Sequence, residues 1–310
     1  MKLRKLLMGT RASPLALAQS RAFAEALQAQ HPGLKVELKK ITTSGDRIQN
    51  RFLAEVGGKG LFVKEIEEQL LEKKIDFAVH SLKDMPAQLP EALALGCLPE
   101  RLDFEDVLVT RDGRGLAELG ENARLGTSSL RRRLQLQTLR PDLRFAMLRG
   151  NIDSRLKRLE QGEFDGIVLA KAGMRRLGLE LSRAKILPIV PAPGQGTLAV
   201  EIREQDSELR EWLRPLHHED TERISVAERR VMRELGGSCN LPLGVLGAIH
   251  QQELKLLAFL ATPDGSRSLT AEAEGVADEP LRVAEALVEK IWDQGGRQIV
   301  DALFCLQPKA

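Results

Sequence analysis

Apolar and polar positions along the first part of the chain predict strands that alternate with helices. Short apolar runs predict the strands, and the segments between them carry apolar residues at the three- and four-residue spacing of a helix. The strands are expected at 6–9, 35–42, 75–80, 106–110, 124–126, 143–148 and 166–170. The helices are expected at 14–30, 61–73, 151–161 and 171–177, with one more starting at Ser128 or Ser129. The alternation predicts two α/β units with mostly parallel sheets.

The pattern changes after residue 220. A helical segment (221–235) leads to the loop GGSCN, two strand-like runs (241–249 and 254–261) and a weaker third. Two further helices, at 278–292 and 296–306, close the chain. This predicts a small α+β domain. Junctions are expected near 98–105 and at PIVPAPGQG (188–196), which holds three Pro and two Gly.

Composition narrows the function classes. The net charge is only +2, aromatic residues make up 4% and there is no Tyr, so stacking platforms for nucleic acid are scarce. No apolar run approaches the ~18 residues of a membrane span. Arg11 and Pro14 interrupt the N-terminal apolar run, which argues against a signal peptide. Three scattered cysteines favour neither a disulfide framework nor a zinc site, so we expect a cytoplasmic protein.

Basic residues gather locally. Between residues 124 and 158 there are nine Arg and one Lys but only two Asp. Several of these arginines follow expected strands at helix starts, as in GTSSLRRRLQL and LRGNIDSRLKRL. Loops at the carboxyl ends of parallel strands converge, and guanidinium groups with helix N-termini bind carboxylate or phosphate. A polyanionic ligand is therefore predicted; the alternative is a solvated basic helix face.

Three other motifs leave alternatives open. In HSLKDMPA, Asp84 is either a general acid or base or the partner of Lys83 in a surface ion pair. VGGKG lacks the Ser or Thr of a phosphate-binding loop, so it is interpreted with 43–50 as a mobile polar loop in which Lys59 is solvated or touches an anion. Cys239 in LGGSCN is either buried or an accessible thiolate with something attached. His217 and His218 are expected to be structural or solvated rather than ligands.

Taken together, the motifs resemble the porphobilinogen deaminase (hydroxymethylbilane synthase) family along essentially the whole chain. The matching segments keep the family's order: GTRASPLALAQS, VGGKGLFVKEIE, HSLKDMPA, GTSSLRRRLQL, LRGNIDSRLKRL, APGQGTLAVE, HHEDTERISVAERRV and LGGSCNLPLG. Eight ordered matches are far more specific than any single motif.

The resemblance implies a fold and an activity. It implies two periplasmic-binding-protein-like (type II) α/β domains, 1–98 with 194–217 and 99–193, and a small C-terminal α+β domain, 218–310. It also implies a monomeric cytoplasmic transferase of haem biosynthesis, which joins four porphobilinogen molecules into hydroxymethylbilane and releases ammonia each time. The implied cofactor is dipyrromethane, held by a thioether at Cys239; no metal, nucleic acid or membrane is implied.

The resemblance also assigns roles to residues. Asp84 would be catalytic, and Lys59 would belong to a lid loop. The cofactor would contact Ser81, Lys83, Asp84, Thr127, Ser129, Arg131, Arg132, Gly150 and Arg155. The incoming substrate would contact Arg11, Ser13, Arg149, Arg155 and Arg176. Guanidinium groups suit such ligands because each pyrrole carries two carboxylates, which arginine binds bidentately.

Some residues depart from the family's pattern. An acidic residue is common where Gly236 stands, and Gly is common where Ser238 stands. Arg133, Cys97 and Cys305 receive no role, and Arg133 is expected to be solvated or structural. The main rival function is a non-catalytic, two-lobed anion receptor, which would leave Cys239 and Asp84 without a use.

Overall fold

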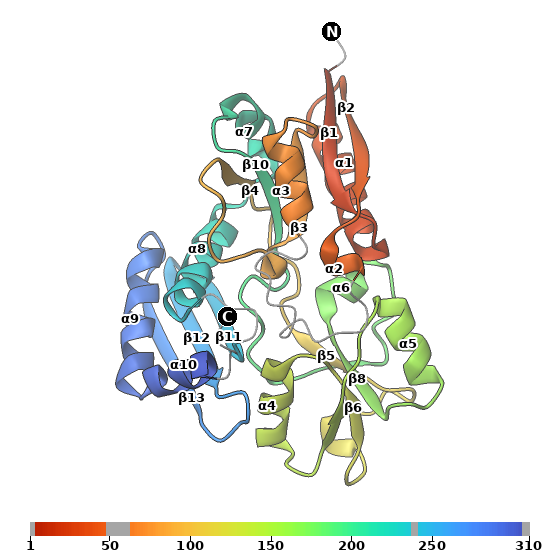
Figure 1. The fold of residues 1–310 in the computed structure, drawn as a ribbon, viewed down its shortest axis with the longest axis vertical. Coiled ribbons are helices and arrows are strands. Elements are labelled where there is room, and N and C mark those ends of the chain that lie inside the picture. The colour runs from red at the N-terminus through yellow and green to blue at the C-terminus, as the bar shows by residue number, and fades with distance from the viewer. Residues whose placement is uncertain (1–3, 48–62, 237–240, 306–310) are drawn as a thin grey trace. The chain divides into compact units, whose positions relative to one another are not determined.

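The computed structural model describes residues 4–47, 63–236 and 241–305, whose contacts divide the chain into two units (Figure 1). The first comprises Met1–Leu102 and Gly196–Glu222, and the second Asp103–Gln195 and Arg223–Ala310. Both five-stranded sheets and the C-terminal sheet lie within single units. The division into three domains predicted from sequence stays a prediction.

The sheet of the first unit has the order β2-β1-β3-β10-β4. Its strands are β1 (Arg4–Arg11), β2 (Leu34–Ile41), β3 (Phe77–Ser81), β4 (Leu93–Cys97) and β10 (Leu198–Arg203). β1 is parallel to β2 and β3, whereas β10 is antiparallel to β3 and β4. Four of the five strands therefore run in one direction, as predicted, and β10, a segment from far along the chain, enters the sheet in the opposite direction.

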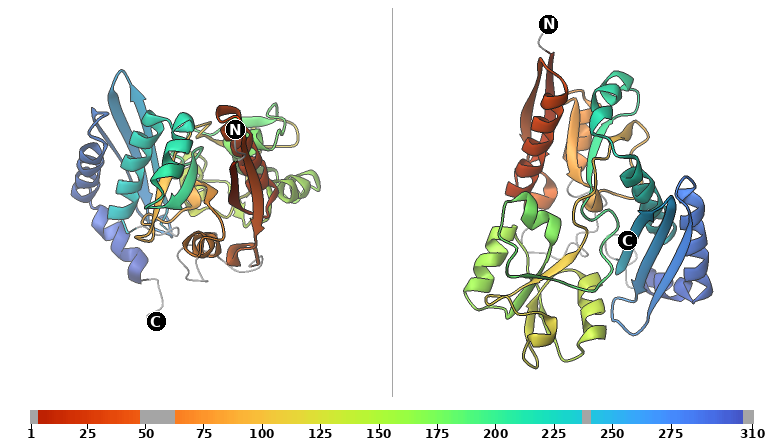
Figure 2. Two further views of the ribbon diagram at one scale, coloured as in Figure 1. Left: turned by 90° about the horizontal axis from the view of Figure 1, so that it is seen from above. Right: turned by 180° about the vertical axis from the view of Figure 1, so that it is seen from behind.

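Helices cover both faces of this sheet. α1 (Pro14–Gln30) buries Phe23 and Leu27 against one face, and it lies beside β1 and β2 in both views of Figure 2. α3 (Lys64–Leu71) buries Ile66 and Leu70 against the other. The shorter helices are α2 (Ser44–Arg47), η1 (Leu82–Asp84), α7 (Ser207–Leu213) and η3 (Arg214–Leu216). The polar loop predicted at 43–50 is thus helical over Ser44–Arg47.

The second unit holds a sheet of order β7-β6-β8-β5-β9. Its strands are β5 (Asp106–Val109), β6 (Arg124–Gly126), β7 (Arg144–Ala146), β8 (Gly166–Ala170) and β9 (Ala184–Ile186). Its helices are η2 (Leu116–Glu118), α4 (Leu130–Leu139), α5 (Ile152–Glu160) and α6 (Lys171–Arg176). Leu136 of α4 belongs to the core on one face, and Leu159 of α5 and Met174 of α6 belong to the core on the other. β6, β7 and β8 are parallel, so their carboxyl ends share one edge.

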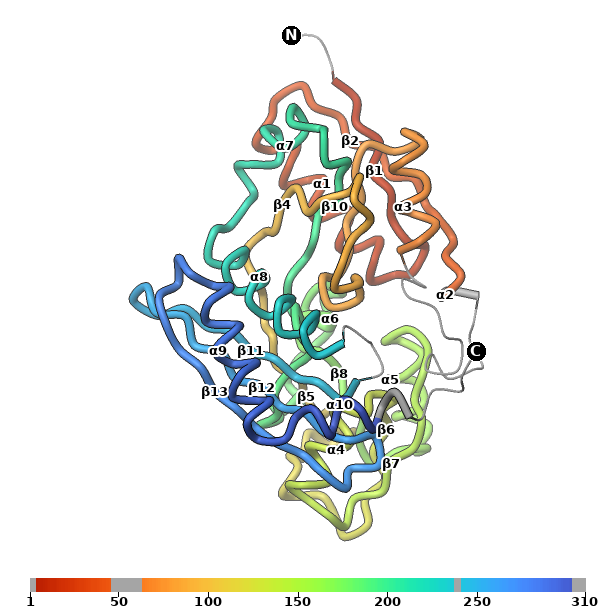
Figure 3. The backbone as a smooth tube through the Cα atoms, turned by 60° about the vertical axis from the view of Figure 1, so that its left-hand side comes forward, coloured from red at the N-terminus to blue at the C-terminus, as the bar shows by residue number. Residues whose placement is uncertain are grey.

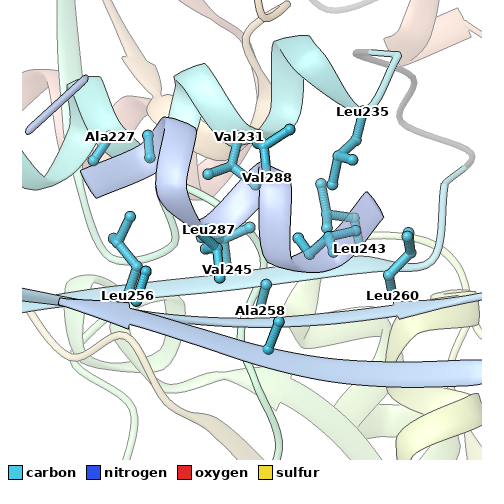
Figure 4. Close-up of a cluster of buried hydrophobic side chains, with 14 of the residues drawn as sticks. Ala227, Val231, Leu235, Leu243, Val245, Leu256, Ala258, Leu260, Leu287 and Val288 are labelled. Carbon is cyan, nitrogen blue, oxygen red and sulfur yellow. The ribbon is translucent and has the colours of Figure 1, made fainter. Parts of the chain in front are cut away.

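The C-terminal sheet also belongs to the second unit. Its antiparallel strands are β11 (Leu243–His250), β12 (Glu253–Ala261) and β13 (Ser268–Val276), with α9 (Pro280–Asp293) alongside (Figure 3). Side chains of α8 (Glu219–Glu234) and α9, including Val231 and Leu287, meet Val245 and Leu256 of the sheet (Figure 4). α10 (Gly296–Cys305) completes this layer. The opposite face packs on Leu134 of α4 and on Val190.

The fold class predicted from sequence is confirmed in its two α/β sheets with their covering helices and in its small C-terminal α+β domain. Of the helices in the described ranges, none is both long enough and apolar enough to cross a bilayer.

Candidate active site

A small recess of about 50 Å³ lies in the first unit, where β1, β3 and the start of α1 meet. Because β1 and β3 are parallel neighbours, their carboxyl ends share one edge of the sheet. The polar side chains that line the recess are Arg11, Ser13, Gln19, His80, Ser81 and Asp84. Four of them, Arg11, Ser13, Ser81 and Asp84, were predicted from sequence.

Local structure fixes several of these side chains. Ser13 is the N-cap of α1, and its Oγ accepts a hydrogen bond from the backbone N–H of Ala16 at 3.3 Å, with Pro14 at the first helical position. Gln19, one turn further along the helix, donates from Nε2 to Oγ of Ser81 at 3.0 Å. These side chains of the recess are therefore held by the end of β3 and the start of α1, and their positions are fixed by hydrogen bonds within the protein.

Asp84 ends η1 and is exposed at the recess. It makes no hydrogen bond or ion pair with any residue in the described ranges, including its neighbour Lys83. The surface ion pair that the sequence left open is not formed. The carboxylate of Asp84 is therefore available to a ligand.

Three titratable groups lie beside the recess. Nε2 of His80, a buried residue of β3, is 3.1 Å from Oε2 of Glu201 on β10, which is fully buried. Glu67 on α3 is half-buried, and its pKa is raised to about 7 by burial and then by the negative charge of Glu201. The charge of His80 lowers the pKa of Glu67 but does not outweigh these two effects. Sequence reasoning assigned none of these three residues to a site.

Arg131 and Arg132, in the first turn of α4, are buried and bind a carboxylate of the protein itself. Nη1 of Arg131 donates to Oδ2 of Asp106 at 2.8 Å. Nε and Nη2 of Arg132 donate to Oδ1 of the same residue at 3.0 and 2.7 Å. Asp106 opens β5, the strand beside β8. Two cations at a helix start, where the helix dipole is unfavourable for them, are thus offset by an internal counter-charge.

The ionisation of Asp106 follows from these neighbours. Its burial alone raises the pKa, but the charges of Arg131 and Arg132 outweigh burial and hold the pKa well below its usual range. Gln195 of the PAPGQG segment adds a hydrogen bond at 2.9 Å from Nε2 to Oδ1. Burial in turn lowers the pKa of Arg131. Asp106 and Gln195 are site residues that the sequence did not reveal, since no local signal connects β5 with α4.

The hydroxyl groups before α4 lie next to the loop that follows β7. Ser129 is the N-cap of α4, and its Oγ accepts from the backbone N–H of Arg132 at 3.4 Å. The backbone N–H of Thr127 bonds to the carbonyl of Ala146 at 3.0 Å, and Ser128 donates to the carbonyl of Leu148 at 2.8 Å. The parallel pairing of β6 and β7 thus brings these two loops together, as predicted.

Arg149, Gly150 and Arg155 belong to the second of these loops and to α5. Nε of Arg149 is buried without a hydrogen-bond partner among the described residues. Nε of Arg155 donates to the carbonyl of Gly150 at 2.8 Å, and Gly150 has φ +103°, a conformation that favours glycine. Burial lowers the pKa of Arg176, at the end of α6, to about 10, partly offset by Asp103.

The two histidines and Arg133, which the sequence did not assign to a ligand site, bond to other parts of the protein. His217 bonds to the backbone N–H of Leu98 and to Glu222, and His218 bonds to Thr221; both are structural, as expected. Nη2 of Arg133 donates to the carbonyl of Pro263 at 3.1 Å, which is also structural. No cluster that could hold a metal ion occurs within the described part of the chain. Lys59 and Cys239 lie outside the described residues.

Comparison with known proteins supplies the family. Residues 6–211 match the model of the porphobilinogen deaminase dipyromethane cofactor binding domain, and residues 223–293 match that of the porphobilinogen deaminase C-terminal domain. The porphobilinogen deaminase of Syntrophobacter fumaroxidans is 44% identical over 97% of this chain and 98% of its own. That of Sorangium cellulosum is 49% identical over 86% and 90%. The crystal structure of the methionine binding protein MetQ aligns at 14% identity over 73% of this chain and 90% of its own, with a TM-score of 0.43.

Proposed function

Because the chain belongs to the porphobilinogen deaminase family, we propose that Asp84 is its catalytic carboxylate and that its strand-end arginines receive the carboxylates of cofactor and substrate. The activity is that of a hydroxymethylbilane synthase. Four porphobilinogen molecules are joined head to tail with release of ammonia, on a dipyrromethane cofactor, in tetrapyrrole biosynthesis. The observation that carries the residue assignments is the carboxylate of Asp84, which has no partner among the described residues, in a recess that Arg11 and Ser13 also line.

The side chains present suit a polyanionic cofactor. Dipyrromethane, when bound, supplies the pyrrole carbon to which the first substrate molecule is joined. We assign its attachment to Cys239. Arg149 keeps a buried Nε without a partner in the described ranges, and a buried donor of this kind calls for an acceptor. Nε and Nη2 of Arg131 make no hydrogen bond within the described ranges, so that edge of the guanidinium can receive a carboxylate.

The proposal assigns the ligands in two sets. The cofactor's carboxylates and pyrrole groups are received by Ser81, Lys83, Asp84, Thr127, Ser129, Arg131, Arg132, Gly150 and Arg155. The incoming porphobilinogen is received by Arg11, Ser13, Arg149, Arg155 and Arg176. In the first unit, the assignments are supported by the recess that Arg11, Ser13, Ser81 and Asp84 line together. In the second unit, they are supported by the hydrogen bonds that join the loop after β6 to the loop after β7.

Asp84 acts on the charge that develops in the reaction. Loss of ammonia from the aminomethyl group of porphobilinogen leaves a cation delocalised over the pyrrole ring. A carboxylate beside the ring N–H stabilises that cation, because opposite charges attract strongly in a partly desolvated site. After the new carbon–carbon bond forms, a proton must leave the junction, and Asp84 would assist its removal.

The proposal also covers the domain organisation, the oligomeric state and the location of the protein in the cell. We propose three domains, 1–98 with 194–217, 99–193 and 218–310. We also propose that the protein is a monomer and that it lies in the cytoplasm; its three scattered cysteines support the second of these. No membrane or nucleic acid partner is proposed.

Two measurements test the function. Intact-mass analysis should show a dipyrrole adduct on the wild-type protein and none on Cys239→Ser. Asp84→Asn should keep the adduct and the fold but lose at least 100-fold in turnover, since general acid–base and electrostatic roles contribute roughly that much. Glu91→Gln, which removes an exposed carboxylate of the same unit, is the control and should match wild type. Substantial turnover in Asp84→Asn would refute the catalytic role.

A further inference from the structure

The charged cluster beside the recess is assembled from three elements of the first unit. In the antiparallel pairing of β3 and β10, His80 lies opposite Ala199 and Glu201 lies opposite Ala78. Residues two apart on a strand share a face, so His80 and Glu201 point to the same side of the sheet. Ala78 on this side packs against Ile66 and Leu70 of α3, and the charges of Glu201 and His80 both act on Glu67 of the same helix.

The cluster contains more polar atoms than the protein satisfies. Both carboxylate oxygens of Glu201, Oε1 of Glu67 and Nε2 of His80 are buried without a hydrogen-bond partner in the described ranges. The 3.1 Å contact of His80 with Glu201 is within ion-pair distance but is not a hydrogen bond. Unsatisfied buried groups cost stability, and buried charge clusters are weak stabilisers. Stability alone does not explain three such groups in one place.

The cluster is also able to hold a proton at neutral pH. Burial disfavours the charged form of a carboxyl group, and the negative charge of a second carboxylate nearby disfavours it further. The pKa of Glu67, raised to about 7 by burial and then by Glu201, reflects this. Among the described residues, the charge of Glu68 on α3 also raises this pKa, and the charged residues Arg11 and Asp84 line the recess together with His80.

Only His80 of the three also lines the recess beside Asp84. We propose that His80, Glu201 and Glu67 form a proton store for the condensation reaction, which exchanges its proton with the recess through His80. Glu67 and Glu201 are positioning residues that act through the imidazole. This inference rests on the proposed function of the recess.

With such a store, the proton that each condensation consumes is matched by the proton that it releases. The carbon–nitrogen bond of the neutral aminomethyl group breaks, its electron pair leaves on nitrogen, and one proton from the store completes ammonia. The new carbon–carbon bond then forms, and the attacked pyrrole carbon loses its proton, which returns to the store. The store is unchanged after each cycle, so the same three residues serve all four additions.

The test is the pH dependence of turnover in the holoenzyme with porphobilinogen. Because the store must begin each cycle protonated, wild-type kcat should fall as pH rises through about 7. The Glu67→Gln side chain cannot release a proton, so this variant should have a kcat about 10- to 100-fold lower than wild type and a KM within twofold of it. Its kcat should no longer fall as pH rises through about 7. Glu67→Asp should retain the fall in kcat as pH rises. Glu72→Gln, an exposed change at the end of the same helix, should behave as wild type.

The outcomes separate this inference from the proposed function. Wild-type turnover that does not fall as pH rises through about 7, or a Glu67→Gln profile that matches wild type, overturns the proton store even if the variant is destabilised. Neither result affects the adduct mass or the loss of turnover in Asp84→Asn. Conversely, absence of the dipyrrole adduct from wild type would refute the proposed function itself.

Discussion

Replacing Asp106 by Asn removes the internal counter-charge of two buried arginines. Four hydrogen bonds end on Asp106, at 2.8 Å from Arg131, 3.0 and 2.7 Å from Arg132, and 2.9 Å from Gln195. Asn keeps the shape but turns one acceptor into a donor that faces a guanidinium. Breaking a buried ion pair from one side costs about 3–5 kcal/mol. This is a large part of a typical total stability of about 5–15 kcal/mol.

The pH dependence of this loss has a definite sign. The pKa of Asp106 is lower in the folded protein than in the unfolded chain, where it lies near its ordinary value. Its stabilising contribution is therefore complete above the unfolded pKa and is lost as pH falls through the folded value. The difference in free energy of unfolding between wild type and Asp106→Asn should be constant above about pH 5 and shrink below about pH 4.

Hydrogen exchange with peptide resolution is the suitable assay, because it measures the opening of β5 and α4 directly, alongside urea unfolding. Asp112→Asn is the matched control, since it removes the same charge from an exposed pair with Arg114 in the same unit. It should leave exchange unchanged, because exposed pairs contribute little. If Asp106→Asn exchanged and unfolded like wild type at pH 7, the assignment of Asp106 as the buried anchor of α4 would be wrong.

Two further predictions concern packing. Gly244→Ala should lower the urea midpoint, because its Cβ would lie 2.7 Å from the carbonyl oxygen of Val190, a backbone atom that cannot move aside alone; Gly120→Ala, where a Cβ meets nothing within 4 Å, is the control. Cys97 should resist alkylation at pH 8 in the native protein and react only after unfolding, because burial and then the charge of Glu222 raise its pKa to about 12. Peptide mapping measures its labelling, and rapid native labelling would contradict its burial.

Local signals account for the elements that the sequence located well. Ser13 and Pro14 mark the start of α1 by cap chemistry, and Ser129 does so for α4. The compact apolar run of β8 was predicted with its observed bounds, Gly166–Ala170. These features depend on residues within one turn or one strand, so the sequence pattern is sufficient to find them.

Elements that depend on distant partners were not located. β10 lies between β3 and β4 and runs antiparallel to both, although more than 100 residues separate it from either. Glu201 illustrates the consequence: on its own strand it reads as one polar residue in an apolar run, and only the pairing register places it beside His80. Candidate residues in the loops that follow parallel strands were predicted, whereas Glu201, whose neighbour is set by strand pairing, was missed.

The geometry also distinguishes two arginines that the sequence treats alike. Arg132 uses all three of its nitrogens, two on Asp106 and Nη1 on the carbonyl of Val168. Arg131 uses Nη1 for both Asp106 and the carbonyl of Val190, which leaves Nε and Nη2 without a bond in the described ranges. If Arg131 receives a ligand carboxylate as proposed, it would do so through Nε and Nη2 and keep its bonds to Asp106 and Val190, whereas a carboxylate at Arg132 would have to displace Asp106 or a carbonyl. Asp106 thus sets both the charge of this buried network and which guanidinium nitrogens keep no bond among the described residues.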